Sequence, residues 1–223
     1  SDWIDNGFTG ENDALGGHDT GAFRVQFLWQ ASERFSALLN LHGWELDGTA
    51  RVFRANILKP GSNDLASGFS QDKVYQDGLN DQEISAQGGA FTLNYEFDFG
   101  TLTAITGYET LDMFSRGDIA GGFGAVFAPP SGPGFIPFPS ESADGLPELD
   151  QFTQEIRLAS DTGGAWDWLV GFFYFDESLQ ADTFSYTSLA PGNPVEGYAF
   201  QTQDASSWAG FASLDFRPSD RWN

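Results

Sequence analysis

Apolar and polar residues alternate with a period of two along most of the chain, and helical periodicity is nearly absent. In the stretch QFTQEIRLAS (Gln151–Ser160), Phe152 and Ile156 fall on one side while Glu155 and Arg157 fall on the other. Successive side chains of a strand point to opposite faces, so this stretch is predicted to be a strand with one apolar and one polar face. Alone, it fits either a sandwich, whose apolar face packs in a core, or a membrane barrel, whose apolar face meets lipid.

The same alternation predicts seven strands. The clearest pattern is AFTLNYEFD at 90–98, whereas the facing of Thr101–Met113 is ambiguous because Leu102 and Ile105 lie on opposite phases. The predicted strands are Phe23–Gln30, Phe35–Leu46, a third strand ending in 90–98, Thr101–Met113, Gln151–Ser160, Trp166–Glu177 and Ser207–Arg217. Many glycines and aromatic residues suit sheets with frequent turns better than a helical bundle.

The connections between these strands alternate in length. Those after the first, third and fifth strands have about three to five residues, whereas those after the second, fourth and sixth have roughly 30 to 45. Outer-membrane barrels have short turns on one rim and long loops on the other. Aromatic residues mark both strand ends, as in the girdles of such barrels: Trp29, Phe35, Phe97, Phe99, Trp166, Phe216 and Trp222 near the short turns, and Trp44, Tyr108, Tyr174 and Trp208 near the long loops.

These features predict that the apolar rows meet lipid and the polar rows face a lumen. Glu155 and Arg157 are two apart on one face, so each is expected to pair with a neighbouring strand, with direct ligand contact as the alternative. The predicted lumen-facing residues are Arg24, Gln26, Asn40, His42, Asn94, Glu96, Glu155 and Arg157.

Charge and composition exclude several classes of function. The chain has 32 acidic and 10 basic residues, a net charge of −22, so nucleic-acid binding is not expected. It has no cysteine, which excludes disulfides and thiolate metal sites. The longest apolar run, WLVGFFYF (Trp168–Phe175), is far shorter than the roughly 20 residues of a spanning helix.

Candidate chemistry is sparse. His18 and His42 are the only histidines and have no converging ligands at metal-site spacing, and GGFGAV (Gly121–Val126) lacks the spacing of a phosphate loop. We therefore expect no metal, no cofactor, no catalytic residue and no enzymatic activity. Aromatic residues in the predicted loops either stack on a ligand ring or pack within the loops: Tyr75, Phe123, Phe127, Phe135, Phe138, Phe184 and Tyr198.

Four stretches resemble the TonB-dependent outer-membrane receptors, bacterial importers with an N-terminal plug inside a barrel of about 22 strands. The most specific is FTQEIRLASDTGGAWDWLVGFFYFDES, where a Gln-Glu-x-Arg-Leu-Ala-Ser strand, a Gly-rich turn and a Trp-Leu-Val-Gly strand occur together. The others are FRVQFLWQASERFSALLNLHG, LNYEFDFGTLTAITGYETLD and SWAGFASLDFRPSDRWN. The resemblance covers essentially the whole chain.

The resemblance implies an all-β fold, an antiparallel up-and-down transmembrane β-barrel segment of about seven strands from a larger barrel. Because no plug, energy-coupling box or closing C-terminal strand is recognised, residues 1–223 are expected to be an internal part of that barrel domain. The implied function is active uptake of a scarce, bulky nutrient (a ferric chelate, cobalamin or an oligosaccharide) across the bacterial outer membrane. The implied partners are outer-membrane lipid, the plug and the inner-membrane TonB complex.

Two alternatives stay open at this point. One is a secreted β-sandwich that binds carbohydrate through its loop aromatics. The other is an outer-membrane barrel of another class, such as a passive channel.

Overall fold

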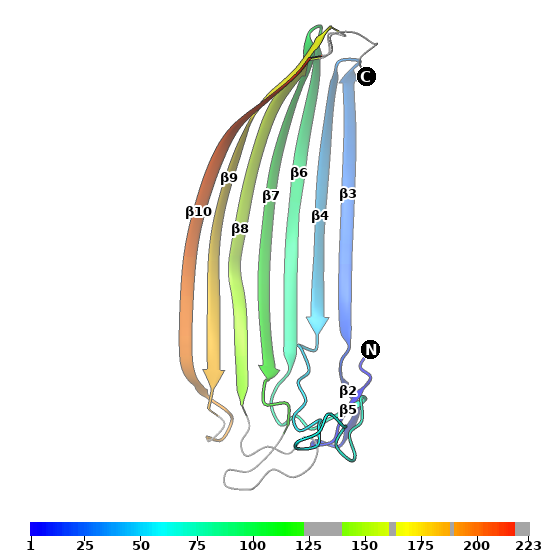
Figure 1. Cartoon of the computed structure of the whole chain (residues 1–223), viewed down its shortest axis with the longest axis vertical. Coiled ribbons are helices and arrows are strands. Elements are labelled where there is room, and N and C mark those ends of the chain that lie inside the picture. The colour runs from blue at the N-terminus through cyan, green and yellow to red at the C-terminus, as the bar shows by residue number, and fades with distance from the viewer. Residues whose placement is uncertain (123–139, 161–163, 188–189, 217–223) are drawn as a thin grey trace.

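The computed structural model describes residues 1–122, 140–160, 164–187 and 190–216, and in these it contains strands and no helix (Figure 1). Seven long strands form one sheet, and three short ones form a second sheet at the end where the long loops lie. The long strands are β3 (His18–Ser32), β4 (Phe35–Gly48), β6 (Asp81–Phe97), β7 (Gly100–Asp118), β8 (Glu141–Ser160), β9 (Trp166–Tyr186) and β10 (Val195–Phe216). The short ones are β1 (Ile4–Asn6), β2 (Glu11–Leu15) and β5 (Lys73–Val74).

The large sheet is an up-and-down meander in the order β10-β9-β8-β7-β6-β4-β3, and every neighbouring pair is antiparallel. The predicted all-β, antiparallel up-and-down fold is therefore confirmed. The sheet is open, because β3 and β10 each have one long-sheet neighbour among the described residues. Within these residues, no helix is long and apolar enough to cross a membrane.

All seven predicted strands are present, but most extend further toward the long loops than predicted. β8 begins at Glu141 and β10 at Val195, so the connection between β9 and β10 is 187–194 and not a long loop. The pairing of β8 is irregular between Gly145 and Glu148, around Pro147, which has no N–H to donate. The sequence pattern did not predict these extensions. Both of their faces are largely polar, so apolar and polar residues no longer alternate there.

The strand register joins the predicted apolar rows into one face, which we call the apolar face. Phe27 lies opposite Leu39, Leu39 opposite Phe91, and the row continues on the remaining strands. In β7 the register puts Leu102 on this face and Ile105 on the other, which resolves the ambiguous strand. The apolar face includes Phe23, Val25, Phe27, Trp29, Phe35, Ala37, Leu39, Leu41, Phe91, Leu93, Tyr95, Leu102, Ala104, Phe152, Ile156, Leu158, Trp168, Val170, Phe172, Ala212 and Leu214.

Aromatic side chains bound this apolar face at both ends of the strands. At the short turns, Trp29 contacts Phe35 edge-on at 5.8 Å between ring centroids, and Trp166 contacts Phe216 at 4.3 Å. Toward the loops lie Tyr108, Tyr174 and Trp208. Trp44 is not in this row, because it pairs with Ala22 and Ala86 on the opposite face; Trp222 lies outside the described residues.

Within the described residues, the large sheet is a single layer with no core against its apolar face. Phe27 is 64% exposed and Trp208 75% exposed, although both belong to regular strands. The buried apolar residues among those described are few and mostly small: Ile4, Ala37, Ala50, Val74 and Ala143. In water such a surface is strongly unfavourable, so the apolar face requires an apolar environment.

Two glycines of the sheet are covered by aromatic rings from the neighbouring strand. A Cβ at Gly43 would overlap the ring of Phe23, and a Cβ at Gly171 would overlap the ring of Phe211. Each pair is directly opposite in the ladder, so the ring fills the space that the glycine leaves.

This packing predicts that Gly171→Val destabilises the protein by about 1–3 kcal/mol, because the new side chain must displace the Phe211 ring. Gly210→Val is the matched control in the same strand pair, since a Cβ at Gly210 meets no atom within 4 Å. Urea titration followed by tryptophan fluorescence measures both free energies of unfolding. Equal losses of unfolding free energy in the two variants would contradict the proposed packing of the Phe211 ring over Gly171.

Candidate functional site: the polar face and the loop cavity

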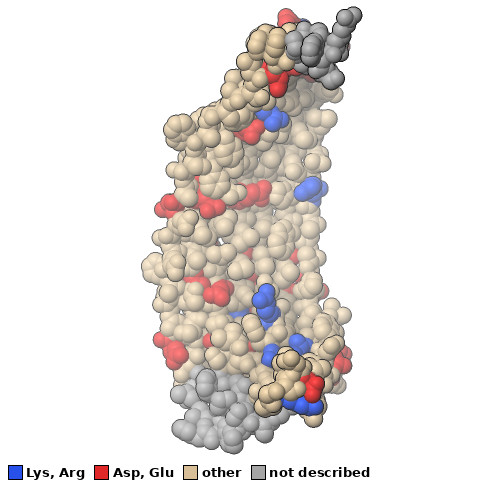
Figure 2. Space-filling model, viewed as in Figure 1, with Lys and Arg blue, Asp and Glu red and all other residues tan. Residues whose placement is uncertain are grey.

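The register places all eight predicted lumen-facing residues on the face opposite the apolar one, which we call the polar face. Arg24 pairs with His42, Gln26 with Asn40, and Asn94 with Thr103, which in turn pairs with Arg157. Glu96 is opposite Thr101, and Glu155 is opposite Ile105, on the same face. Charged side chains occur along the length of the sheet in the view of Figure 2.

His42 and Glu109, which are 67 residues apart in the chain, form a polar contact on this face. His42 Nε2 lies 3.0 Å from Glu109 Oε2 although β6 runs between their strands. The residue between them is Gly88, and a Cβ there would overlap the Glu109 carboxylate. Glycine is therefore what allows the two side chains to meet across the middle strand.

Glu155 and Arg157 do not pair with neighbouring strands as predicted. Arg157 Nη1 instead lies 3.3 Å from Oε1 of Glu155, two residues away on its own strand. The neighbouring strands offer no charged partner at these positions. Arg157 lies opposite Thr103 and Gly171, and Glu155 lies opposite Ile105 and Phe173. The pair is partly exposed, so its contribution to stability is small.

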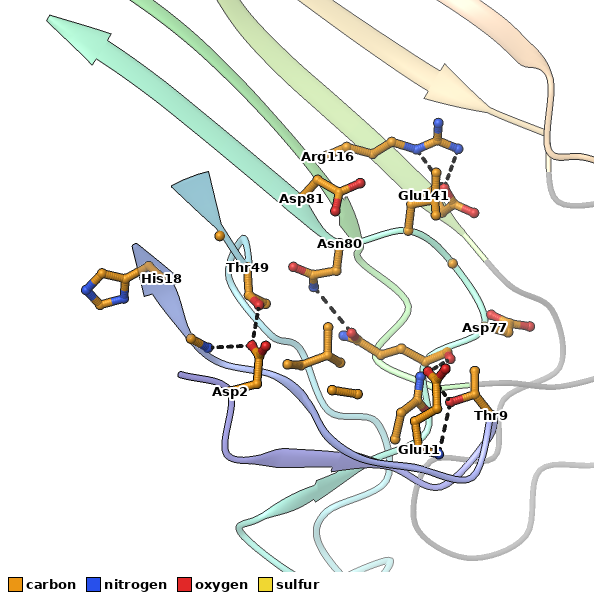
Figure 3. A pocket seen from close by; sticks show the side chains of 18 of the residues that line it. Asp2, Thr9, Glu11, His18, Thr49, Asp77, Asn80, Asp81, Arg116 and Glu141 are labelled. Atoms are coloured by element: carbon orange, nitrogen blue, oxygen red, sulfur yellow. Dashed lines mark hydrogen bonds and ion pairs between the residues drawn. The ribbon is translucent and has the colours of Figure 1, made fainter. Parts of the chain in front are cut away.

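Polar residues also form a cavity of about 860 Å³ at the loop end, lined by the N-terminal segment and the ends of several strands (Figure 3). Sequence analysis did not predict this cavity. The small sheet forms part of its frame: β1 pairs with β2 antiparallel and with β5 in parallel, which brings residues 4–6 to residues 73–74. Ile4 and Val74 are buried there, with 3% and 2% of their surface exposed.

Side-chain hydrogen bonds hold the N-terminal segment against the strand ends. Asp2 Oδ1 accepts a hydrogen bond from the Gly17 N–H at 2.9 Å, and Thr49 Oγ1 accepts one from the Gly16 N–H at 3.0 Å. Because these contacts join residues far apart in sequence, they position the rim of the cavity.

Three buried amides form the floor of the cavity. Asn6 Nδ2 donates to the Gln76 carbonyl at 2.9 Å, and Asn80 Nδ2 donates to Gln76 Oε1 at 3.2 Å. Gln76 is 1% exposed, and Asn6 and Asn80 are each 7% exposed. The Asn80 Oδ1 atom is buried and accepts no hydrogen bond from the residues that the structure describes. A buried acceptor without a donor costs free energy.

Asp118 organises the loops behind the cavity. It is fully buried, and its carboxylate accepts hydrogen bonds from the N–H groups of Asp77, Gly78, Ala120 and Gly121 at 3.1–3.3 Å. Burial nevertheless raises its pKa, since desolvation outweighs these four bonds. One carboxylate thereby connects the loop before β6 to the loop after β7.

The buried Glu141 forms an ion pair with the partly buried Arg116 on the cavity wall. Arg116 Nη2 lies 2.6 Å from Glu141 Oε2, and its guanidinium stacks on the Tyr186 ring at 3.8 Å from the centroid. Asn193, in the β9–β10 connection, donates to the other Glu141 oxygen. The arrangement provides partners for both oxygens of Glu141, and this carboxylate balances the charge of Arg116.

The lining is strongly acidic. It holds seven carboxylates and one arginine: Asp2, Glu11, Asp19, Asp47, Asp77, Asp81, Glu141 and Arg116. Asp19, Asp47 and Glu83 are directly opposite one another on β3, β4 and β6, where like charges repel. Asp19 and Asp47 are shared with a second cavity of about 570 Å³ that adds Glu45, Glu83 and Asp112. Within the described residues, no three acidic or histidine side chains are grouped as a metal site.

The aromatic residues predicted in loops are placed differently. Phe184 and Tyr198 are opposite residues of β9 and β10, with rings 5.0 Å apart, so their assignment to loops is wrong. Tyr75 is in a loop and lies beneath the ammonium group of Lys73 at 5.6 Å. Phe123, Phe127, Phe135 and Phe138 lie outside the described residues.

Comparison with family models, curated proteins and solved structures finds no match to this chain. The geometry of the two polar regions is therefore the basis for any functional assignment.

The raised pKa of Asp77 predicts that the stability of the loops around Asp118 depends on pH. Burial, followed by the nearby Asp118 charge, raises its pKa from 3.8 to about 6. A carboxyl group whose pKa is raised on folding favours the fold when protonated, so the loops are more stable near pH 5 and lose stability as the pH rises through 6. Hydrogen exchange of residues 75–80 at pH 5 and pH 8 measures this change.

Asp77→Asn should reduce the difference in protection between the two pH values, because the titrating group is removed. Asp64→Asn, an exposed change in the same connection, is the control and should keep the full difference. Greater protection at pH 8 than at pH 5 would contradict the inference that protonated Asp77 stabilises these loops.

Proposed function

We propose that this chain is part of the wall of a transmembrane β-barrel in a bacterial outer membrane, and that the barrel is a TonB-dependent receptor. The observation that carries the proposal is the apolar face, which continues across all seven strands of a sheet that is one layer thick. Lipid is the environment that such a face fits, because it covers apolar side chains without requiring a second protein layer.

The pattern of the two faces supports a barrel over a secreted sandwich. A sandwich requires a second sheet against the apolar face, and within the described residues no such sheet covers it. The opposite face carries amides, hydroxyls and charged groups, as the interior of a channel or a plugged barrel does. The aromatic residues at both ends of the apolar face suit the two interfaces of a bilayer.

In this proposal the loop cavity lies on the extracellular side, beyond the lipid-covered part of the strands. A plug inside the barrel and the inner-membrane TonB complex would supply gating and energy. The proposed role is transport of a bulky nutrient and not catalysis. A passive channel is the second candidate, since the two faces fit it equally well, and the family-like stretch around Gln154–Ser160 favours the receptor.

The proposal predicts that the apolar face contacts lipid and the polar face does not. The chain has no cysteine, so Val25→Cys and Gln26→Cys each provide one labelling site, on adjacent residues with opposite facing. With a bimane label on each variant in lipid vesicles, brominated lipid should quench the label at position 25 strongly and that at position 26 weakly.

A sandwich gives a different result in the same experiment. It folds in buffer without detergent or lipid, and brominated lipid then quenches neither label. Either observation would overturn the membrane assignment, and similar quenching at both positions would contradict the proposed facing.

A further inference from the structure

We propose that an aromatic patch near the loop end of the large sheet binds the saccharide part of a membrane glycolipid. The patch, which we call the outer aromatic patch, consists of Phe114 on β7, Phe184 on β9, and Tyr198 and Phe200 on β10. The inference rests on the proposed function for its setting, because it takes the apolar face to be the outward face of a barrel. It concerns a surface separate from the polar face and the loop cavity.

The strand register puts the patch on the same side of the sheet as the apolar face. Phe184 is an even number of residues from Phe172 on β9 and lies directly opposite Tyr198. The β9–β10 ladder is regular from Tyr198 to Phe216, so the facing of these side chains does not change along it. Phe114 is likewise an even number of residues from Tyr108 on β7, whose pairing with β6 is regular throughout.

The four rings form a continuous row that the strands hold in place. The ring centroids of Phe114 and Phe184 are 6.3 Å apart, and those of Phe184 and Tyr198 are 5.0 Å apart. Phe200 continues the row, with its centroid 6.1 Å from that of Tyr198 and the two planes 27° apart. On β8, which runs between the first two rings, Ala143 lies opposite Phe184 and is 1% exposed. This small residue allows the rings of the flanking strands to meet.

The patch is open and small. Phe200 is 62% exposed, Tyr198 56% and Phe114 36%, although all three belong to regular strands. At about 200 Å² for each aromatic side chain, these three leave roughly 300 Å² uncovered. A stable protein–protein interface buries about 800 Å² on each partner. The patch therefore fits a ligand of a few rings better than it fits a second copy of the chain.

In the proposed orientation the patch lies above the lipid headgroups. Trp208, at the loop end of the apolar face, and Phe200 are eight residues apart on β10, which is about 26 Å along a strand. A strand tilt of about 45° leaves about 18 Å of height, whereas a headgroup layer is only about 5–8 Å thick. Acyl chains therefore do not reach the patch, and polar residues such as Asp204 and Thr202 separate it from the apolar face.

Polar side chains beside the rings favour a saccharide. Gln180 Nε2 donates to Asp182 Oδ1 at 3.1 Å, and Asp182 lies opposite Phe200 in the ladder. Thr202 lies opposite Gln180 on the same face. A pyranose ring has a face of C–H groups, which packs on an aromatic ring, and hydroxyl groups at its edge, which bond to carboxylate, amide and hydroxyl side chains.

The position of the patch favours a lipid-linked saccharide over a soluble one. The patch faces away from the lumen, so a solute that enters the barrel does not pass over it. The molecules that surround the outward face of a barrel are membrane lipids, and a lipid reaches about 18 Å above its headgroup layer only when it carries sugars. A glycolipid therefore satisfies both the location and the chemistry of the patch.

The test compares two forms of one glycolipid on the full protein, extracted from membranes in a neutral detergent. The probes are a rough-type lipopolysaccharide with its core saccharide and a truncated form with the same lipid part and no core hexoses. Isothermal titration measures both affinities. We expect the wild type to bind the complete form at least tenfold more tightly than the truncated form.

The variant Y198T/F200T should reduce this ratio to less than twofold, because it removes two rings of the patch. Its strands should still form, since both side chains are exposed and threonine is favoured in strands. F53T/L65T is the matched control and should keep the full ratio, because it removes two exposed apolar side chains from the connection between β4 and β6, outside the patch.

Four results would overturn the proposal. Equal affinity of the wild type for the two glycolipids would exclude recognition of the saccharide, and equal loss of the ratio in the two variants would exclude the patch. Tighter binding of the free core saccharide than of the complete glycolipid would favour a soluble sugar, since linkage to lipid should raise affinity. Self-association that Y198T/F200T abolishes while the ratio persists would favour a second copy of the chain.

None of these results alters the quenching expected at positions 25 and 26. Failure of the saccharide assignment and failure of the membrane assignment are therefore distinguishable.

Discussion

The pairing register of the seven long strands is the constraint on which the rest of the structure depends. Side chains alternate along each strand, so a slip of one residue would move a whole row to the other face. The tight turns between Ser32 and Phe35 and between Phe97 and Gly100 set the register of two hairpins. With these pairings in place, Phe27, Leu39 and Phe91 align on adjacent strands and the separate rows become one continuous surface.

Stability is distributed differently in the two halves of the molecule. The large sheet relies on its backbone ladder and on ring contacts such as Phe211 over Gly171, while its apolar face depends on the surrounding medium. The loop end instead has a small interior built mainly from polar groups, with Asp118 bound to four backbone N–H groups and Glu141 paired with Arg116. Such networks are specific because each member must be satisfied.

Charge distinguishes the loop cavity from the connection beside it. Ten of the 32 acidic residues line the two cavities, and Asp19, Asp47 and Glu83 are opposite one another there. Basic side chains occur near the loop end in the view of Figure 2. The connection between β4 and β6 contains Arg51, Arg54, Lys59 and Lys73. The cavity lining is therefore acidic, whereas this connection carries four of the ten basic residues of the chain.

The sequence by itself determined the strand class, the seven central strand segments and the facing of most of their residues, because a period of two is visible wherever one face is apolar. It did not determine the strand extensions at Glu141 and Val195, where both faces are polar and the period carries no signal. It also could not indicate that Arg157 would pair with Glu155, since that choice depends on Gly171 and Phe173 in the neighbouring strand. The cavity was decided by tertiary structure alone: Asp2, Asp47, Asn80 and Glu141 are far apart in the chain and meet only after the small sheet and strand ends come together.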